Sequence, residues 1–157
     1  MLNFGSDNFL KIKSRSTEFS KTSAVIDMTK SFIEHDLHAD GEVDRARDID
    51  LLNRSKAFFK ENDHFDHEQF SQQVFEDQNI GSRFREYSRE RDIYDLDVEE
   101  SFAISAEAVK KKQRVFKSVL KLDKNFHVYI HGNREKIEKG TDEQGRKYYK
   151  LYYEEEN

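Results

Sequence analysis

The residues with the most suggestive chemistry are cations that gather near the C-terminal end of the 157-residue chain. Residues 110–153 hold 13 Lys/Arg and 5 Asp/Glu, a net of +8, whereas residues 1–109 carry −10 and the tail Glu154–Glu156 adds −3. Because lysine and arginine bind phosphates without reading base sequence, we predict a phosphate-contacting surface. Its predicted members are Lys110, Lys111, Lys112, Arg114, Lys117, Lys121 and Lys150. A solvated strand surface that simply favours lysine is the alternative explanation.

Histidine pairs three or four residues apart are the other candidates for chemistry. Two pairs with three-residue spacing, His35/His38 and His64/His67, have acidic neighbours and could in principle share one metal ion. Both pairs fall at predicted helix ends or loops, where histidine and aspartate are common, so we predict no metal site. His127 and His131 share the outer face of a predicted strand, where imidazoles beside lysine suit phosphate as well as metal, unless the face is only solvated.

Signals of catalysis are missing from the sequence. It has no glycine-rich phosphate loop and no serine in a nucleophile-elbow context, and no carboxylate pair stands out by its spacing. Cysteine is absent, which excludes disulfides and thiolate chemistry. We therefore predict that the protein is not an enzyme and uses no cofactor. No apolar run approaches the ~20 residues of a membrane helix, so we expect no membrane partner.

A predicted antiparallel hairpin at residues 115–131 positions many of these side chains. Apolar and polar residues alternate on both sides of a short turn-forming break at Asp123–Asn125, and so short a link favours an antiparallel partner. A second alternating segment occupies residues 146–153. We expect the apolar face of these strands to be buried against the rest of the chain, through Phe116, Leu120, Phe126, Val128, Ile130 and Leu151.

The preceding part of the chain has apolar residues at helical spacing. We predict helices at about residues 22–37, 43–62, 67–77 and 79–91, with Thr22 or Ser23 capping the first and Asp66 the third. A short strand at 9–13, an acidic connector at 92–100, a weak strand at 101–105 and a helix capped by Ser105 complete the pattern. Residues 133–139 fit one or two helical turns closed by Gly140.

The apolar period therefore changes from about 3.6 to 2 near residue 100. This change predicts an α+β fold, in which an N-terminal helical part is followed by a small antiparallel β-sheet. We place a mainly helical subdomain at residues 1–100 and an antiparallel β subdomain at residues 101–157, packed together as one compact domain.

Long segments of the chain resemble a known family. SVLKLDKNFHVYIHGNREKIEKG followed by GRKYYKLYYEEE is similar to the C-terminal end of bacterial nucleoid-associated proteins of the NdpA type, particularly Bacteroidetes-like members. The upstream segments LLNRSKAFFKENDHFDHEQF, VFEDQNIGSRFREY and SFAISAEAVKKKQRVFKSV follow the order of that family. The resemblance covers most of the chain, best from Leu51 onward. Since family members are longer, it implies one compact C-terminal domain of a longer protein.

The resemblance implies a function in the bacterial nucleoid. Members are described as soluble nucleoid components that bind double-stranded DNA and have no established enzymatic activity. We therefore expect a cytoplasmic, nucleoid-associated protein whose partners are double-stranded DNA and a second copy or other nucleoid proteins. The alternative is a protein-interaction or oligomerisation domain without direct DNA contact, in which acidic helices repel DNA and a sheet edge pairs with a partner.

Overall fold

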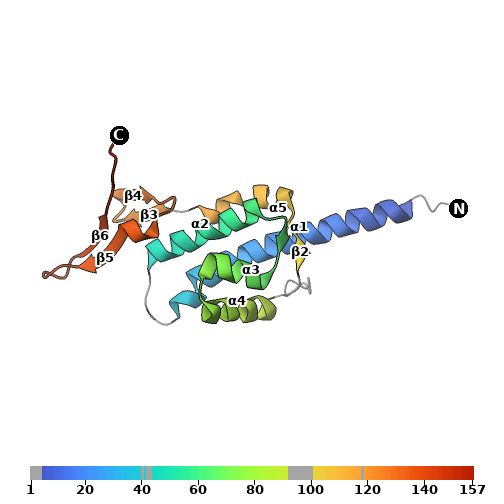
Figure 1. Ribbon diagram of the computed structural model, residues 1–157, viewed down its shortest axis with the longest axis horizontal. Helices are drawn as coiled ribbons and strands as arrows, with labels where there is room; N and C mark the ends of the chain where they lie inside the picture. The colour runs from blue at the N-terminus through green and yellow to red at the C-terminus, as the bar shows by residue number, and fades with distance from the viewer. Residues whose placement is uncertain (1–4, 40, 42–43, 92–100, 118) are drawn as a thin grey trace.

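The computed structural model describes residues 5–39, 41, 44–91, 101–117 and 119–157, with the backbone alone for residues 5–16. Its fold is α+β, as the sequence predicts: helices dominate the N-terminal part, and small antiparallel strand pairs dominate the C-terminal part (Figure 1). The helices are α1 (Gly5–Glu34), α2 (Arg45–Glu61), α3 (His67–Phe70), α4 (Gln78–Glu90) and α5 (Ala106–Lys111). A π-helical turn η2 (Ser71–Phe75) extends α3, and 3₁₀ turns form η1 (Asp36–His38), η3 (Gln113–Phe116) and η4 (Arg134–Lys136).

The described strands form three separate antiparallel pairs. The short strands β1 (His64–Phe65) and β2 (Phe102–Ala103) pair across the helical part. Strands β3 (Val119–Leu122) and β4 (Phe126–Tyr129) form the first hairpin, and β5 (Ile137–Thr141) and β6 (Lys147–Leu151) form the second. Both hairpins lie at the same end of the molecule, beside the start of α2 (Figure 1). The predicted connector at 92–100 lies outside the described residues.

The first helix is longer than its sequence predicts. It begins at Gly5, so the predicted strand at 9–13 and the cap at Thr22 or Ser23 are both wrong. Thr22 is instead a buried residue inside α1, and its hydroxyl oxygen accepts a hydrogen bond of 3.0 Å from the backbone N–H of Ser105. A threonine that could have started a helix thus fixes a distant segment. The caps at Asp66 and Ser105 are confirmed, because each side chain accepts from backbone N–H groups of the following turn.

Phenylalanine fills the core of the helical part. Phe32, Phe58, Phe65, Phe70 and Phe84 are fully buried, and their rings meet at centroid separations from 5.1 to 6.0 Å. Most of these pairs are tilted or edge-on, which is the favoured arrangement for aromatic rings. Aromatic packing therefore makes up for the modest aliphatic content of the sequence.

A second, smaller core joins the hairpins to α2. Ala46 and Ile49 from the start of α2 pack with Leu120, Ile130 and Ile137, all of which are buried. The second hairpin is also held by Arg134, whose guanidinium lies 2.7 Å from an Asp44 carboxylate oxygen. Burial opposes ionisation of Asp44, but hydrogen bonds from the Arg47 backbone N–H and from Arg134 outweigh it, so the pKa of Asp44 is lowered.

The predicted hairpin is confirmed with shorter strands, but two residues of the predicted strands' core are exposed. Leu120 and Ile130 are buried and Val128 is partly buried, but Phe126 is 62% exposed and Leu151 is 48% exposed. Burial falls off toward the turn because α2 covers only the other end of the hairpin, and Phe126 directly follows the turn. Phe116 is buried as predicted, although it belongs to η3 and not to a strand.

The connection between the hairpins is also shorter than predicted. Only the 3₁₀ turn η4 forms there, and Gly140 lies inside β5 opposite Tyr148, so its predicted role as a helix exit is wrong. A Cβ atom on Gly140 would lie 2.4 Å from the Tyr148 ring, so the glycine leaves space for that ring.

Candidate nucleic-acid interface

The structure separates the seven predicted cations into four places. Lys110, Lys111 and Lys112 lie at the end of α5, and only the first has no ion pair within the described part of the chain. Lys112 Nζ is 2.8 Å from Asp27 on α1, and Lys111 Nζ is 3.7 Å from Glu107. Carboxylates therefore already neutralise much of the predicted cationic run before any ligand arrives.

Arg114 and Lys117 belong to a groove between α2, η3 and the first hairpin. The groove has a volume of about 390 Å³. Its described lining residues are Asn53, Lys56, Gln113, Arg114, Phe116, Lys117, Val119, Tyr129, Ile130 and His131, none of which is acidic. We call this site the basic groove. Arg114, Lys117 and Lys56 provide its charge, and none of them forms an ion pair with a described residue.

The local backbone explains why two of these cations meet. Arg114 and Lys117 are three residues apart around η3, and side chains at this spacing overlap along a 3₁₀ turn. The backbone N–H of Lys117 donates to the carbonyl oxygen of Arg114 at 3.2 Å, which closes the turn. Phe116, which is 2% exposed, anchors the turn in the helical core between the two cations.

The opposite wall of the groove is fixed to α2. The Asn53 side chain donates a hydrogen bond of 2.8 Å to the backbone carbonyl oxygen of Ile130, at the end of the first hairpin. Ile130 is followed by His131 and preceded by Tyr129, and the Tyr129 side chain is 62% exposed. Cations, an imidazole and an exposed phenol ring thus surround one open groove. Such a set can hold phosphate oxygens, and the ring can contact a sugar or a base edge.

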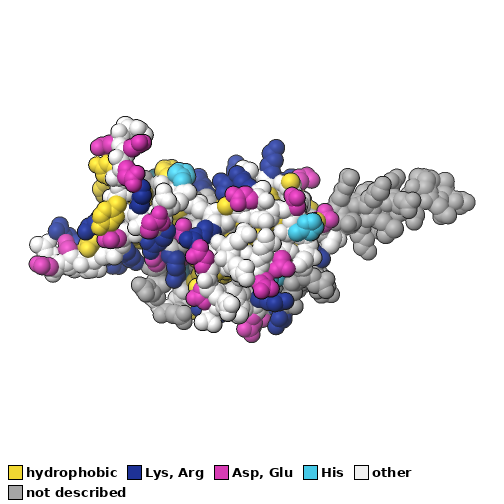
Figure 2. All heavy atoms as spheres, in the orientation of Figure 1, with side chains coloured by type: hydrophobic (Ala, Val, Ile, Leu, Met, Phe, Trp, Pro, Cys, Tyr) yellow, Lys and Arg dark blue, Asp and Glu magenta, His cyan; other side chains and the backbone are white. Residues whose placement is uncertain are grey.

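The other predicted cations lie outside the basic groove. Lys121 is exposed on β3 opposite His127, on a neighbouring part of the first hairpin. Lys150 is exposed on β6 opposite Glu138, in the second hairpin. Of the predicted set, the groove therefore brings together Arg114 and Lys117. Figure 2 shows lysine and arginine side chains spread over the visible face of the molecule and interspersed with acidic ones.

Sequence reasoning missed Lys56 and left His131 out of the predicted site. Lys56 is on α2, far from the basic segment in the sequence, and only the docking of the hairpin on that helix brings it to Arg114. Its position on the polar side of α2 identifies an outward-facing residue but does not reveal which element faces it. His131 could be found from its alternation with Tyr129 in the strand pattern.

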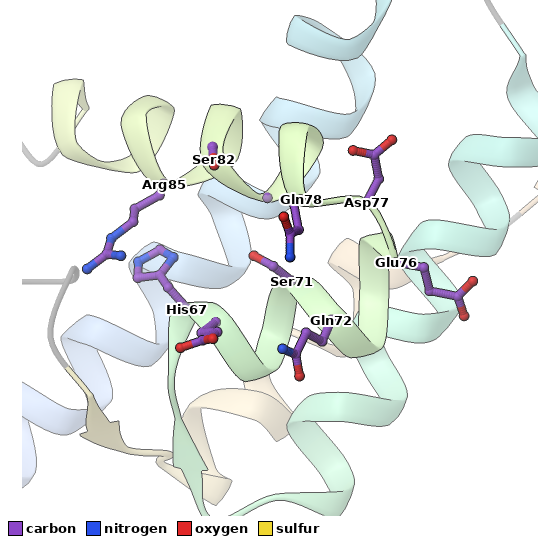
Figure 3. Close-up of a pocket in the computed structure, with 10 residues that line it drawn as sticks. His67, Ser71, Gln72, Glu76, Asp77, Gln78, Ser82 and Arg85 are labelled. Carbon is purple, nitrogen blue, oxygen red and sulfur yellow. The ribbon is translucent and has the colours of Figure 1, made fainter.

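A second pocket of about 480 Å³ lies between η2 and α4. Glu68, Glu76, Asp77 and Arg85 contribute both signs of charge to its wall, so the pocket does not concentrate cations. Figure 3 shows Arg85 and His67 at one end and Glu76 and Asp77 at the other. The three carboxylates in its wall make the pocket unsuited to a polyanion.

Two of the histidines at predicted helix ends, His38 and His67, contact buried side chains of the protein and so have a structural role. His67 is 4% exposed, with its ring centroid 4.9 Å from Phe65 and 5.6 Å from Phe84. His38 Nε2 lies 2.8 Å from a carboxylate oxygen of the buried Asp48, whose pKa is raised by burial despite this contact. Among the residues that the structure describes, no cluster of three or more His, Asp or Glu side chains is arranged to hold a metal ion.

Comparison of the chain with models of protein families, with curated proteins and with solved structures gives no match. No helix in the described ranges combines the length and the apolar character needed to cross a membrane.

Proposed function

We propose that this protein is a nucleoid-associated module that binds double-stranded DNA without sequence preference, and that this binding, not catalysis, is its role. The observation that carries the proposal is the basic groove, where Lys56, Arg114 and Lys117 surround an opening without an acidic described neighbour in its wall. Phosphate is the ligand that such a set binds best. The resemblance of residues 118–140 and 145–156 to the C-terminal end of NdpA-type proteins supports the same function.

The charge of the rest of the molecule limits the strength of this binding. The chain carries a net charge of −5, which repels a polyanion at long range. DNA must therefore approach from the side of the groove. At an ionic strength of about 0.1 M, salt screens charges that lie more than ~10 Å from the DNA, and this weakens the repulsion by the acidic residues elsewhere. We expect modest affinity with a strong dependence on salt, and little dependence on base sequence.

The test is a titration of the protein with a fluorescent DNA duplex at several salt concentrations. The variant replaces Lys56, Arg114 and Lys117 together by Gln, which removes the charge and keeps polar side chains of similar length. Each neutralised phosphate contributes ~0.9 to the slope of log affinity against log salt, so the slope should flatten by up to ~2.7. A second duplex of unrelated sequence should bind equally well.

A matched control removes the same charge elsewhere. Replacing Lys30, Arg85 and Lys139 by Gln changes the net charge equally, but these residues lie on α1, α4 and β5, outside the groove. This control should keep the slope close to that of the native protein. If the groove variant and the control lose affinity equally, only net charge matters, and the groove is not the DNA site.

A further inference from the structure

Strand β6 of the second hairpin has an outer edge that pairs with no described strand. Strand β6 pairs only with β5 in a two-stranded sheet. The hydrogen bonds from the Tyr152 N–H to the Lys136 carbonyl oxygen and from the Asp142 N–H to the Arg146 carbonyl oxygen lie at the two ends of this ladder. Because backbone groups alternate in direction along an antiparallel ladder, those of Lys147, Tyr149 and Leu151 point to the other edge.

Apolar side chains accumulate along this strand and the residues after it. Tyr148 is 43% exposed, Leu151 48%, Tyr152 49% and Tyr153 69%. Figure 2 shows hydrophobic side chains grouped over β6 and the C-terminal segment, at the end of the molecule where the two hairpins lie. An unpaired edge flanked by exposed apolar side chains favours the addition of another strand.

The order of charges along the strand indicates which strand would fit. Arg146 and Lys147 lie at its start, and Glu154, Glu155 and Glu156 follow its end. An antiparallel copy of the same segment reverses this order, so that cations face carboxylates from both sides. The segment is therefore complementary to itself, and a second copy of this chain is the partner that it fits.

We propose that two copies of the protein pair through β6, antiparallel about a two-fold axis at Leu151. Lys147 then lies opposite the partner's Glu155, Arg146 opposite the partner's Glu156, and Tyr149 opposite the partner's Tyr153. These cross-strand pairs are favourable, and two-fold symmetry forms each of them twice. The product is a four-stranded sheet in the order β5, β6, β6, β5.

Neighbouring registers lose these contacts. An axis at Lys150 places that lysine opposite its own copy, which is repulsive. An axis at Tyr152 places Lys147 opposite Asn157, so the lysine no longer faces a carboxylate. Residues 152–156 must extend β6 for the proposed pairing, so the bend at Glu154 has to straighten. The 3.5 Å contact between the Tyr153 hydroxyl and the Glu156 carboxylate then breaks, because side chains three residues apart in a strand lie on opposite faces. This long, exposed contact costs little to lose.

The test uses charge reversal and sedimentation velocity over a wide concentration series. Lys147→Glu alone places like charges opposite each other twice in the dimer, and so does Glu155→Lys alone. Each variant should weaken self-association by on the order of tenfold, given the energies of cross-strand charge pairs. An equimolar mixture of the two variants restores both opposite-charge pairs, so it should associate as strongly as the native protein.

Lys124→Glu is the matched control, because this exposed lysine lies in the turn of the first hairpin and has no place in the proposed pairing. It should leave self-association unchanged, and far-UV circular dichroism should show that all variants are folded. A native protein that stays monomeric at every concentration would overturn the proposal. So would a mixture that associates no better than the two variants alone, because that result excludes the proposed register.

Discussion

Leu120 is the residue that tests how the first hairpin is attached. It is 2% exposed and packs with Ala46 and Ile49 of α2. Leu120→Ala should lower the free energy of unfolding by roughly 2–5 kcal/mol, the range for a large-to-small change in a packed core. Phe126→Ala, on the same hairpin but 62% exposed, should change it by less than about 0.5 kcal/mol. Urea unfolding of both variants measures the contrast, and equal losses would contradict the assigned burial.

Asp66 is a residue whose contribution should depend on pH. Its carboxylate accepts hydrogen bonds from the backbone N–H groups of Gln69 and Glu68, and the bond from Gln69 is the largest cause of its lowered pKa. A lowered pKa in the folded state stabilises the protein above the unfolded pKa near 3.8, and this stabilisation is lost as pH falls through the folded value.

Asp66→Ala should therefore cost about 1 kcal/mol near neutral pH, as is typical for losing a helix cap. The difference from the native protein should shrink below about pH 4, where the carboxyl group becomes protonated. Asp66→Asn keeps an acceptor oxygen that does not titrate, so its loss near neutral pH should be smaller, and it too should shrink at acid pH as the native carboxylate becomes protonated. Urea unfolding at several pH values checks both variants. A loss in Asp66→Ala that stays constant down to pH 3 would argue against the carboxylate cap.

At the scale of elements, α4 depends on a close approach to η2. A Cβ atom on Gly81 would lie 2.7 Å from the Cβ and Oγ atoms of Ser71, which extends from η2 toward α4 (Figure 3). Glycine is a poor helix former, so Gly81→Ala alone would be worth up to ~1 kcal/mol to an isolated helix. Here we expect a net destabilisation, because overpacking costs typically ~1–3 kcal/mol.

A double-mutant cycle separates these two effects. Ser71→Gly removes the clashing atoms, so Gly81→Ala should be better tolerated in that background than in the native protein. Thermal or urea unfolding of the two single variants and the double variant gives the coupling free energy. Additive effects on the free energy of unfolding would show that the contact between α4 and η2 does not limit the size of the side chain at position 81.

The elements themselves could largely be predicted, because apolar spacing and caps are local signals. The stripe on α2 and the caps at Asp66 and Ser105 follow directly from the sequence. The start of α1 could not be predicted in this way, since the polar residues before Thr22 lack an apolar face and the role of Thr22 depends on a contact with Ser105. The π-helical turn after α3 likewise leaves no local signature.

At the scale of the whole molecule, the candidate site was only partly predictable, because it depends on how distant elements dock. Arg114 and Lys117 are close in sequence and could be found from composition. Lys56 reaches them only because Asn53, on the same helix, holds the end of the first hairpin. Lys112 was predicted as a DNA contact, yet its pairing with Asp27 on α1 could not be seen without the fold.

The acidic C-terminal tail connects the two proposed interactions. Replacing Glu154, Glu155 and Glu156 by Gln removes three carboxylates and changes the net charge from −5 to −2. Weaker long-range repulsion should then raise the affinity for duplex DNA at low salt, with the gain disappearing near 1 M salt, where the Debye length is about 3 Å. The same change removes the carboxylates that face Lys147 and Arg146 across the proposed β6 pair, so self-association should weaken. In this one variant, DNA titration should therefore show a higher affinity for the duplex, whereas sedimentation velocity should show weaker self-association. If both interactions weaken together, DNA binding requires the dimer, and the groove of a single copy is not sufficient.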